Sequence, residues 1–287
     1  MAEIKVSNGW KDYEMILTGD GQKMERWGKY ILKRPEPQAI WPNKNWPHCD
    51  AIYHRSQKGG GEWEYIRNIP KKWVIKYGQL KFNIETMGFK HTGIFPEQGV
   101  NWDFMMEKIK KANRNINVLN LFAYTGGATL ACAYVGASVC HVDAAKGMVN
   151  KAKSNLALSN LSDRPVRFIV DDVIKFVNRE IRRGNKYDAI IMDPPSYGRG
   201  PKGELWKIEE ELYNLISLCM EVLSNKPLFF LVNSYTSNLS PMLVEDILNM
   251  TLKKRYGGRI SSYELGLKVT NQKIDLPCGS TGRWEND

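Results

Sequence analysis

From about residue 115 onward, short apolar runs alternate regularly with longer amphipathic stretches. The short runs suit buried strands, and the stretches between them place apolar side chains at helical spacing. Nearly continuous apolar strands that alternate with helices are typical of a parallel sheet covered on both faces. The pattern predicts strands over 117–123, 138–142, 166–170, 187–192 and 228–233, and helices over 127–135, 145–161, 173–183, 209–223 and 241–255.

The first hundred residues follow a different pattern. Seven of the nine tryptophans lie at or before Trp102, among turn signals such as 18–21 and 59–61. Alternating β-forming and polar residues, as over 26–33 and 81–85, indicate hairpins and short strands. The prolines over 34–47 exclude a regular helix or central strand, so we expect a crossing loop there. The expected division is a β-rich accessory domain over 1–85, a connecting segment over 86–115 and an α/β domain over 116–287.

The strand ends of the α/β domain carry the candidate chemistry, because doubly wound sheets bind ligands at the carboxyl ends of their strands. The first strand runs into Tyr124-Thr125-Gly126-Gly127, where two glycines let the backbone approach a ligand at a helix N-terminus. The second ends at Asp143, whose carboxylate can accept hydrogen bonds from both hydroxyls of a ribose. The third ends at Asp172, which can accept a bond from an exocyclic amino group. The fourth ends in Asp193-Pro194-Pro195.

Each of these features also has a simpler explanation. Two adjacent glycines can be a helix-packing turn, a single Asp is often a helix cap, and Asp-Pro-Pro can be a rigid loop. Four such features in order on successive strands favour a binding site. The segment 124–130 lacks the G-x-G-x-x-G pattern and a basic residue for phosphate, so a dinucleotide is disfavoured. An adenosine without phosphates, as in S-adenosylmethionine, fits better.

Composition and charge add a broad constraint on partners. With 43% apolar and 25% charged residues, the chain is expected to be globular, and its formal charge of +10 favours an anionic partner such as nucleic acid. That charge is shared equally, with +5 in residues 1–100 and +5 in the remainder. No apolar run is long enough for a membrane span, and no signal region follows the N-terminus. We therefore expect a cytoplasmic protein.

The cysteines and histidines give little support to metal or disulfide chemistry. The five cysteines are scattered without a C-x-x-C pair, which disfavours a disulfide framework or a structural zinc site. The four histidines show no i, i+4 pairing, so we expect no catalytic metal.

The strand-end motifs resemble those of class I S-adenosylmethionine-dependent RNA methyltransferases. Within this family, the sequence is similar to the bacterial 23S rRNA enzymes that methylate cytosine C5 or guanine N2. The resemblance covers about residues 80–287 and implies a Rossmann-like class I methyltransferase sheet with a small β-rich N-terminal domain. The segments that carry it are 120–127, Val142-Asp143, Val170-Asp171-Asp172, 193–197 and 90–98, the last of which is similar to the K-T-G-F-F-x-x-Q segment of those enzymes.

The resemblance also implies how S-adenosylmethionine would be bound. Asp143 would bind the ribose hydroxyls, Asp172 adenine N6, and Asp193 would lie near the sulfonium. The amide of Val173 would face the adenine ring, and the segment 124–126 would surround the methionine moiety. The full set of implied cofactor contacts is Phe95, Gln98, Tyr124, Thr125, Gly126, Asp143, Ala144, Asp172, Val173 and Asp193.

The Asp193-Pro194-Pro195-x-Tyr197 element suits the positioning of an amine. The Pro194 carbonyl can accept a hydrogen bond from an exocyclic NH2 and hold the nitrogen lone pair towards the methyl group. Tyr197 can stack on an extruded base. The catalytic candidates are thus Asp193, Pro194 and Tyr197, and the substrate-binding candidates are Pro195, Tyr197, Arg199 and Lys202. Arg199 and Lys202 could reach flanking phosphates or simply belong to a solvated loop.

The sequence departs from its cytosine-C5 relatives where their chemistry needs a thiol. Those enzymes add a Cys thiolate to C6, from a Ser-Cys-Ser stretch after the fifth strand. The matching stretch here is Ser234-Tyr235-Thr236, and Cys219 is expected in the core of a helix. This disfavours a covalent route and favours methylation at nitrogen. The guanine-N2 relatives carry Asn-Asn at Tyr235-Thr236, so the target atom stays open.

The end of the chain and the overall function leave alternatives. The segment 275–284 could be the last hairpin of the sheet or a loop over the active site, with Cys278 as a possible pocket residue. The leading hypothesis is a methyltransferase of a ribosomal RNA base, with 23S rRNA as partner and a monomer or homodimer as the assembly. A methyltransferase of a protein or small molecule, and a non-catalytic RNA-binding protein, are the alternatives. The N-terminal domain could dock RNA or be a structural cap.

Overall fold

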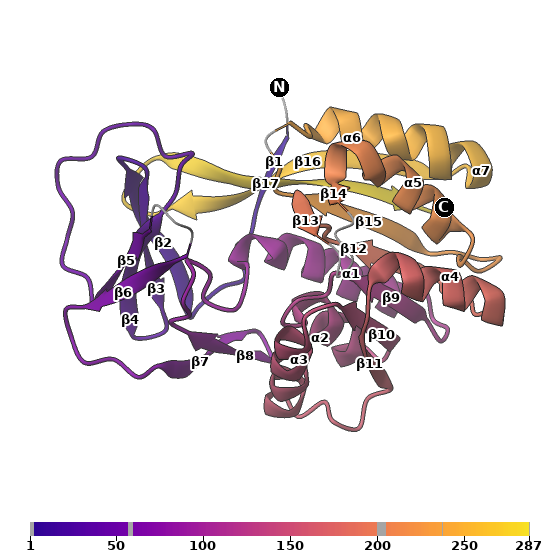
Figure 1. Cartoon of the computed structure of the whole chain (residues 1–287), viewed down its shortest axis with the longest axis horizontal. Coiled ribbons are helices and arrows are strands. Elements are labelled where there is room, and N and C mark those ends of the chain that lie inside the picture. Colours follow the sequence, from indigo (N-terminus) through magenta and orange to yellow (C-terminus); the bar gives the residue numbers. More distant parts are fainter. Residues whose placement is uncertain (1–2, 57–59, 200–204, 237, 287) are drawn as a thin grey trace. The chain divides into compact units, whose positions relative to one another are not determined.

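The alternating half of the chain forms the parallel sheet that its apolar strands predict. The computed structural model describes residues 3–56, 60–199, 205–236 and 238–286. Its central strands are β9 (Asn117–Leu121), β10 (Ser138–Asp143), β11 (Val166–Val170), β12 (Ala189–Met192) and β15 (Phe229–Ser234). They pair in parallel in the order β11-β10-β9-β12-β15 (Figure 1). The carboxyl ends of all five strands therefore meet at one edge.

A long hairpin continues this sheet. Its strands are β16 (Arg259–Val269) and β17 (Ile274–Glu285), and β17 pairs antiparallel with β15. The segment 275–284 is thus the last hairpin of the sheet and not a loop. The short β1 (Ile4–Val6) pairs with β16.

Helices cover both faces of the parallel sheet. They are α1 (Gly99–Lys111), α2 (Gly127–Tyr134), α3 (Lys146–Leu158), α4 (Val173–Arg183), α5 (Ile208–Met220), α6 (Pro241–Leu248) and α7 (Lys254–Tyr256). The predicted helix over 241–255 is helical throughout, but a π-helical turn, η2 (Asn249–Lys253), separates α6 from α7. Thr251 Oγ1 in this turn donates to the Ile247 carbonyl at 2.6 Å and so competes with the backbone for that acceptor.

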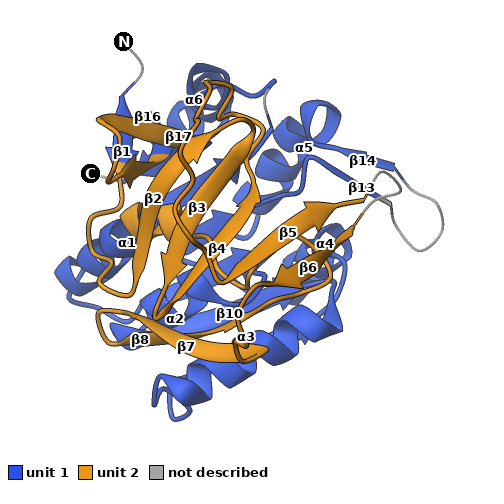
Figure 2. Ribbon diagram, turned by 90° about the vertical axis from the view of Figure 1, so that its left-hand side faces the viewer, with its two compact units in different colours: residues 1–5, 101–265, 278–287 blue, residues 6–100, 266–277 orange. Residues whose placement is uncertain are grey.

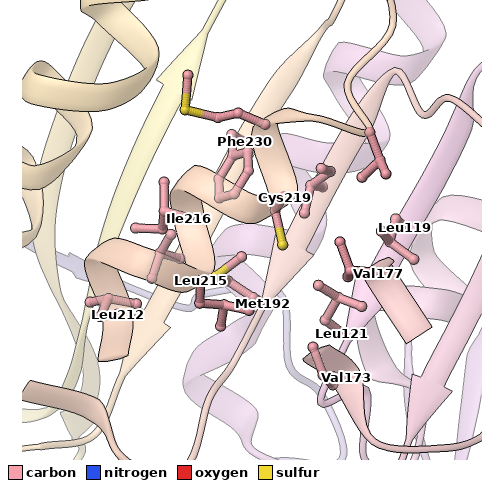
Figure 3. Close-up of a cluster of buried hydrophobic side chains, with 14 of the residues drawn as sticks. Leu119, Leu121, Val173, Val177, Met192, Leu212, Leu215, Ile216, Cys219 and Phe230 are labelled. Carbon is pink, nitrogen blue, oxygen red and sulfur yellow. The ribbon is translucent and has the colours of Figure 1, made fainter. Parts of the chain in front are cut away.

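The main apolar core lies between the sheet and helices α4, α5 and α6. Figure 3 shows side chains of α4 and α5 packed against Leu119, Leu121 and Met192 of the sheet. Cys219 of α5 is fully buried in this cluster, as its sequence context predicts. On the opposite face, Phe104 of α1 packs edge-on against Phe229, with ring centroids 5.4 Å apart. The sheet is therefore covered on both sides and presents its strand ends for binding.

The first hundred residues fold mainly into hairpins and short strands, as expected. They form β2 (Tyr13–Gly19), β3 (Gln22–Trp27), β4 (Tyr30–Pro35), β5 (Ala51–Arg55) and β6 (Gly61–Tyr65), in that order, and a hairpin of β7 (Lys72–Tyr77) and β8 (Leu80–Glu85). The turn signal at 18–21 joins β2 to β3. Strands β4 and β5 pair in parallel, so the Pro-rich stretch between them is a crossing connection, as predicted. A 3-10 helix (Pro96–Gln98) follows β8.

The chain divides into two units, which Figure 2 distinguishes by colour. Unit 1 comprises Met1–Lys5, Asn101–Leu265 and Cys278–Asp287, and unit 2 comprises Val6–Val100 and Gly266–Pro277. The β16–β17 hairpin contributes residues to both. The domain boundaries expected at residues 85 and 115 stay a prediction. Among the described residues, no helix is long and apolar enough to span a membrane.

Candidate functional site

The loop after β9 is held in an unusual backbone conformation. Phe122, Tyr124 and Gly126 have positive φ angles of 54°, 49° and 88°. A Cβ at Gly126 would lie 3.0 Å from the Cβ of Ala152, so glycine is needed for both space and conformation. Phe122 and Tyr124 are strained because residues with a Cβ disfavour positive φ, and such strain is concentrated at functional sites. The predicted Gly126 turn is therefore a real constraint of the fold.

Asp143 organises this loop from the next strand. Its Oδ2 accepts a hydrogen bond from the Tyr124 amide and its Oδ1 accepts one from the Ala145 amide, both at 2.8 Å. The side chain is half-buried and Ala144 beside it is exposed. Each carboxylate oxygen has a second lone pair that can accept a further bond. Asp143 thus fixes the loop and can still bind a ligand hydroxyl.

Helix α4 begins at the third strand end with Asp172 as its N-cap. The Asp172 Oδ1 accepts from the Lys175 amide at 2.9 Å, which is the simpler role that the sequence also allowed. The neighbouring Asp171 forms an ion pair with Arg179. The amide of Val173 is in the first turn of α4, where no intrahelical acceptor exists. Asp172 and Val173 therefore combine a capping role with groups that can face a ligand.

The Asp193-Pro194-Pro195 loop is held on both sides of Pro194. The Asp193 amide donates to the Leu121 carbonyl at 3.4 Å, and Trp206 Nε1 donates to the Pro195 carbonyl at 2.6 Å. Ser196 Oγ is hydrogen-bonded to Thr236 Oγ1 after β15. Among the described residues, no donor reaches the carbonyl of the buried Pro194. The loop is fixed while this acceptor is left for another donor.

Tyr197 lies in a short hairpin that follows this loop. Strands β13 (Tyr197–Arg199) and β14 (Leu205–Lys207) pair antiparallel, with Tyr197 opposite Lys207. The Tyr197 side chain is 52% exposed. Trp206 of β14 packs against Phe122, with ring centroids 6.0 Å apart, which links this hairpin to the loop after β9.

A buried polar network supports the end of β15. Asn101 Nδ2 donates to Asn233 Oδ1 and lies 3.0 Å from Thr281 Oγ1, and Tyr263 donates to Asn101 Oδ1 at 2.8 Å. These four side chains are almost fully buried. The Ser234↔Ser280 register places Cys278 beyond the last residue pair of β15, at the same sheet edge as Asp193. Cys278 is half-buried.

A second buried network lies beneath helix α2. Asn120 Nδ2 donates to Thr129 Oγ1, and Thr129 Oγ1 is 2.9 Å from His141 Nδ1. His141 is fully buried, and its Nε2 has no partner among the described residues. Burial lowers the pKa of His141 to about 3, so the ring is neutral at physiological pH. The network fixes α2 immediately after the Gly126 turn.

Several site residues were not apparent from the sequence. Trp206, Asn155, Thr236 and Asn101 act on the site through long-range hydrogen bonds, and Asn155 Nδ2 donates to the Thr125 carbonyl at 3.0 Å. No local sequence pattern indicates that these residues contact the site. A polar residue inside the apolar face of a predicted helix, as at Asn155, is the one available clue.

Like the contacts predicted at the strand ends, four further ligand contacts stay predictions. Phe95 precedes the 3-10 helix and Gln98 ends it, and both lie in unit 2. Arg199 lies in β13, and Lys202 is outside the described residues. Their proposed contacts with cofactor or phosphate rest on the sequence resemblance.

Three strand ends thus bring carboxylates to one edge of the sheet, on Asp143, Asp172 and Asp193, beside a strained glycine turn. A family model described as S-adenosylmethionine-dependent methyltransferase matches residues 40–216, more than half of the chain. The chain belongs to this methyltransferase family. It is therefore an S-adenosylmethionine-dependent enzyme, as the strand-end motifs predicted.

Similar proteins agree with this assignment. An S-adenosylmethionine-dependent methyltransferase from Agrobacterium tumefaciens, known from its crystal structure, is 35% identical in sequence. The two structures match with a TM-score of 0.93 over 99% of this chain and 93% of that one. A ribosomal RNA large subunit methyltransferase K/L from Shewanella frigidimarina is 31% identical over 62% of this chain and 25% of that protein. The Legionella pneumophila protein of that name is 26% identical over 70% of this chain and 29% of its own length. This chain spans less than a third of the length of these two relatives.

The residues of the methyltransferase site fit its cofactor. A sulfonium is cationic, and carboxylates at the strand ends stabilise a positive charge electrostatically. The Asp143 carboxylate can accept hydrogen bonds from ligand hydroxyls, and the Gly126 turn lets the backbone come close to the cofactor. Asp143, Asp172 and Val173 would hold the adenosine part, and the 124–126 loop would hold the methionine part.

Proposed function

We propose that this methyltransferase modifies a nitrogen atom of a base in large subunit ribosomal RNA, without a covalent cysteine step. The single observation that carries the proposal is the Pro194 carbonyl, which lies in a loop held from both sides and accepts no hydrogen bond from any residue that the structure describes. An exocyclic amine has the N–H donor that such an acceptor needs. The names of the Shewanella and Legionella relatives support ribosomal RNA as the substrate. On this proposal, the enzyme acts on ribosomal RNA in the cytoplasm.

The chain would promote the reaction mainly by orientation. Bound S-adenosylmethionine supplies an electrophilic methyl group. The Pro194 carbonyl accepts one N–H of the base amine and turns the nitrogen lone pair towards that methyl group. As the new N–C bond forms and the methyl–sulfur bond of the cofactor breaks, the amine nitrogen becomes more acidic, and the Asp193 carboxylate would accept its proton. The loop over 193–195 is hydrogen-bonded to Leu121 and Trp206, and these bonds keep both groups in place.

Tyr197 would hold the base itself. Its half-exposed ring stands in the hairpin directly after the amine-positioning loop. Stacking of a base on an aromatic side chain contributes about 1 to 3 kcal/mol. Removal of the ring should therefore weaken base placement and leave the adenosine contacts on β10 and α4 unchanged.

The residues around β15 favour nitrogen over carbon as the target. Cytosine C5 is not nucleophilic enough without prior addition of a thiolate to C6. Strand β15 ends at Ser234, and the chain continues with Tyr235 and Thr236 in place of a cysteine. Cys278 is the one thiol at this sheet edge, so its replacement separates the two chemistries.

The test is methyl transfer in vitro to ribosomal RNA purified from a strain that lacks the gene. We expect Cys278→Ser to retain wild-type turnover. Tyr197→Ala should lose about 5- to 150-fold in turnover, the equivalent of the stacking energy, while Tyr197→Phe retains most of it. Affinity for S-adenosylhomocysteine, measured by calorimetry, should be the same in all four proteins.

Two results would count against the proposal. Loss of transfer in Cys278→Ser with a normal melting temperature would indicate a covalent cysteine route. Transfer by the wild type to a protein or small molecule, with none to RNA, would exclude RNA as the substrate.

A further inference from the structure

The segment after β8 is tied to one face of the β4–β5–β6 sheet of unit 2, where Figure 2 shows these strands side by side. Arg34 Nη1 donates to the Lys90 carbonyl at 2.5 Å, Tyr53 to the Gly88 carbonyl at 3.4 Å, and Trp63 Nε1 to the Met87 carbonyl at 2.7 Å. One side chain from each of three successive strands thus holds a backbone carbonyl of the segment. These contacts use the backbone of Lys90 and not its ammonium group.

Basic side chains gather around this segment. Lys23 of β3 and Arg34 of β4 are directly paired across the sheet, and Arg55 ends the adjacent strand β5. The nearby carboxylates are already used. Glu25 is fully buried and accepts two bonds from Arg34, at 2.7 and 2.9 Å, and Glu36 pairs with Lys23 at 3.0 Å.

Lys90 forms no direct ion pair with any described residue of this cluster. It is half-buried, and among the described residues no carboxylate lies within ion-pair distance of its ammonium group. The same holds for the exposed Arg55. A half-buried charge without a directly paired partner is costly, and a bound ligand of opposite charge would offset that cost.

The titration behaviour of the cluster agrees with an unbalanced positive potential. Burial and then the Lys23, Arg34 and Arg55 charges lower the pKa of Lys90, although Glu36 opposes them. Burial, Arg34, Lys90 and Lys23 lower the pKa of His91 to about 4. His91 is therefore neutral at pH 7 and adds no charge of its own.

We propose that Lys90 and Arg55 bind a backbone phosphate of the RNA substrate, an inference that rests on the proposed function. Lys23 and Arg34 strengthen the local positive potential, but their own ion pairs keep them from the phosphate. Because Arg34 holds the Lys90 carbonyl, the backbone from which the lysine side chain extends is fixed. The role assigns to unit 2 a direct part in substrate binding, independent of the cofactor residues of unit 1.

The test is the salt dependence of binding to a fluorescein-labelled oligouridylate, measured with the full chain. Each phosphate contact to single-stranded RNA contributes about 0.7 to the slope of log affinity against log salt concentration. We expect Lys90→Gln and Arg55→Gln each to reduce that slope by up to about this amount. The matched control is Lys76→Gln, an exposed lysine of β7 outside the cluster, which should leave the slope unchanged.

Folding and catalysis are checked separately. The three variants should share the wild-type melting temperature. Arg55 is exposed, so its variant tests the site even if Lys90→Gln unfolds. Slopes for Lys90→Gln and Arg55→Gln equal to that of Lys76→Gln would overturn the phosphate site. If the wild type still methylates ribosomal RNA, the proposed function survives that result. A wild type that binds no RNA at low salt would overturn the phosphate site as well.

Discussion

At the scale of single residues, the candidate site depends on side chains that serve the fold and, in our proposal, bind the ligand as well. Asp143 fixes the loop after β9 through both oxygens, whereas Asp172 caps α4 through one. Both were predicted as ligand contacts, and both also have the structural role that the sequence left open. Sequence patterns can place such a carboxylate at a strand end, but they cannot show how its lone pairs are shared.

This difference predicts unequal effects of the same substitution. In Asp143→Asn, one backbone amide would face the new NH2 group, so the loop is lost along with a ribose acceptor. We expect affinity for S-adenosylhomocysteine to fall more than 100-fold, from roughly 3 kcal/mol of lost interactions. Asp172→Asn keeps the helix cap, because Asn caps helices as well as Asp does. Its affinity for S-adenosylhomocysteine should fall about tenfold. Calorimetry measures both, and equal wild-type affinity in Asp143→Asn would refute the ribose assignment.

His141 predicts a specific dependence of stability on pH. Its pKa is about 3 in the folded protein and near 6.5 when exposed, so below pH 6.5 the unfolded chain binds a proton that the folded chain does not. Stability should therefore fall with decreasing pH, by about 1.4 kcal/mol per unit down to pH 3 from this group. His141→Asn removes this part. Urea unfolding at pH 5 and pH 7 tests it, and identical pH slopes in variant and wild type would contradict the prediction.

At the scale of elements, local signals set the boundaries that the sequence predicted best. Helix α4 matches its prediction at both ends because Asp172 caps it and Gly184, with φ of 68°, stops it. The helix predicted over 145–161 ends earlier, at Leu158, before Asn160 with φ of 57°. The hairpin of β13 and β14 was not predicted, since its pairing depends on contacts such as Trp206 with Pro195.

The start of α2 can be tested by comparing two glycines. Gly126→Ala should destabilise the protein by about 1 to 3 kcal/mol and weaken S-adenosylhomocysteine binding, because its φ is positive and Ala152 leaves no room. Gly147 is exposed inside α3, and a Cβ there meets nothing within 4 Å. Gly147→Ala should therefore be neutral or stabilising by up to about 1 kcal/mol. Thermal unfolding measures both, and equal destabilisation would show that the Gly126 turn has no special constraint.

At the scale of the whole molecule, the sequence predicted the parallel sheet and its strand ends but not the long-range contacts that support them. The Asn101, Asn233, Tyr263 and Thr281 network joins residues that are more than 130 positions from Asn101. Likewise, the β16–β17 hairpin contributes to both units, and nothing in the local pattern indicates this. Such contacts depend on the completed fold. The positive charge is shared equally between residues 1–100 and the remainder, and our proposal assigns part of it, at Lys90 and Arg55, to RNA binding.

The central claim is that this methyltransferase acts on a base nitrogen of ribosomal RNA. The most direct measurement is mass spectrometry of nucleosides from the large subunit rRNA of a strain lacking the gene, compared with its parent. The account predicts that one N-methylated nucleoside is lost and is restored by the wild-type gene but not by an Asp143→Asn copy. Identical nucleoside profiles, or loss of a C-methylated nucleoside instead, would contradict it.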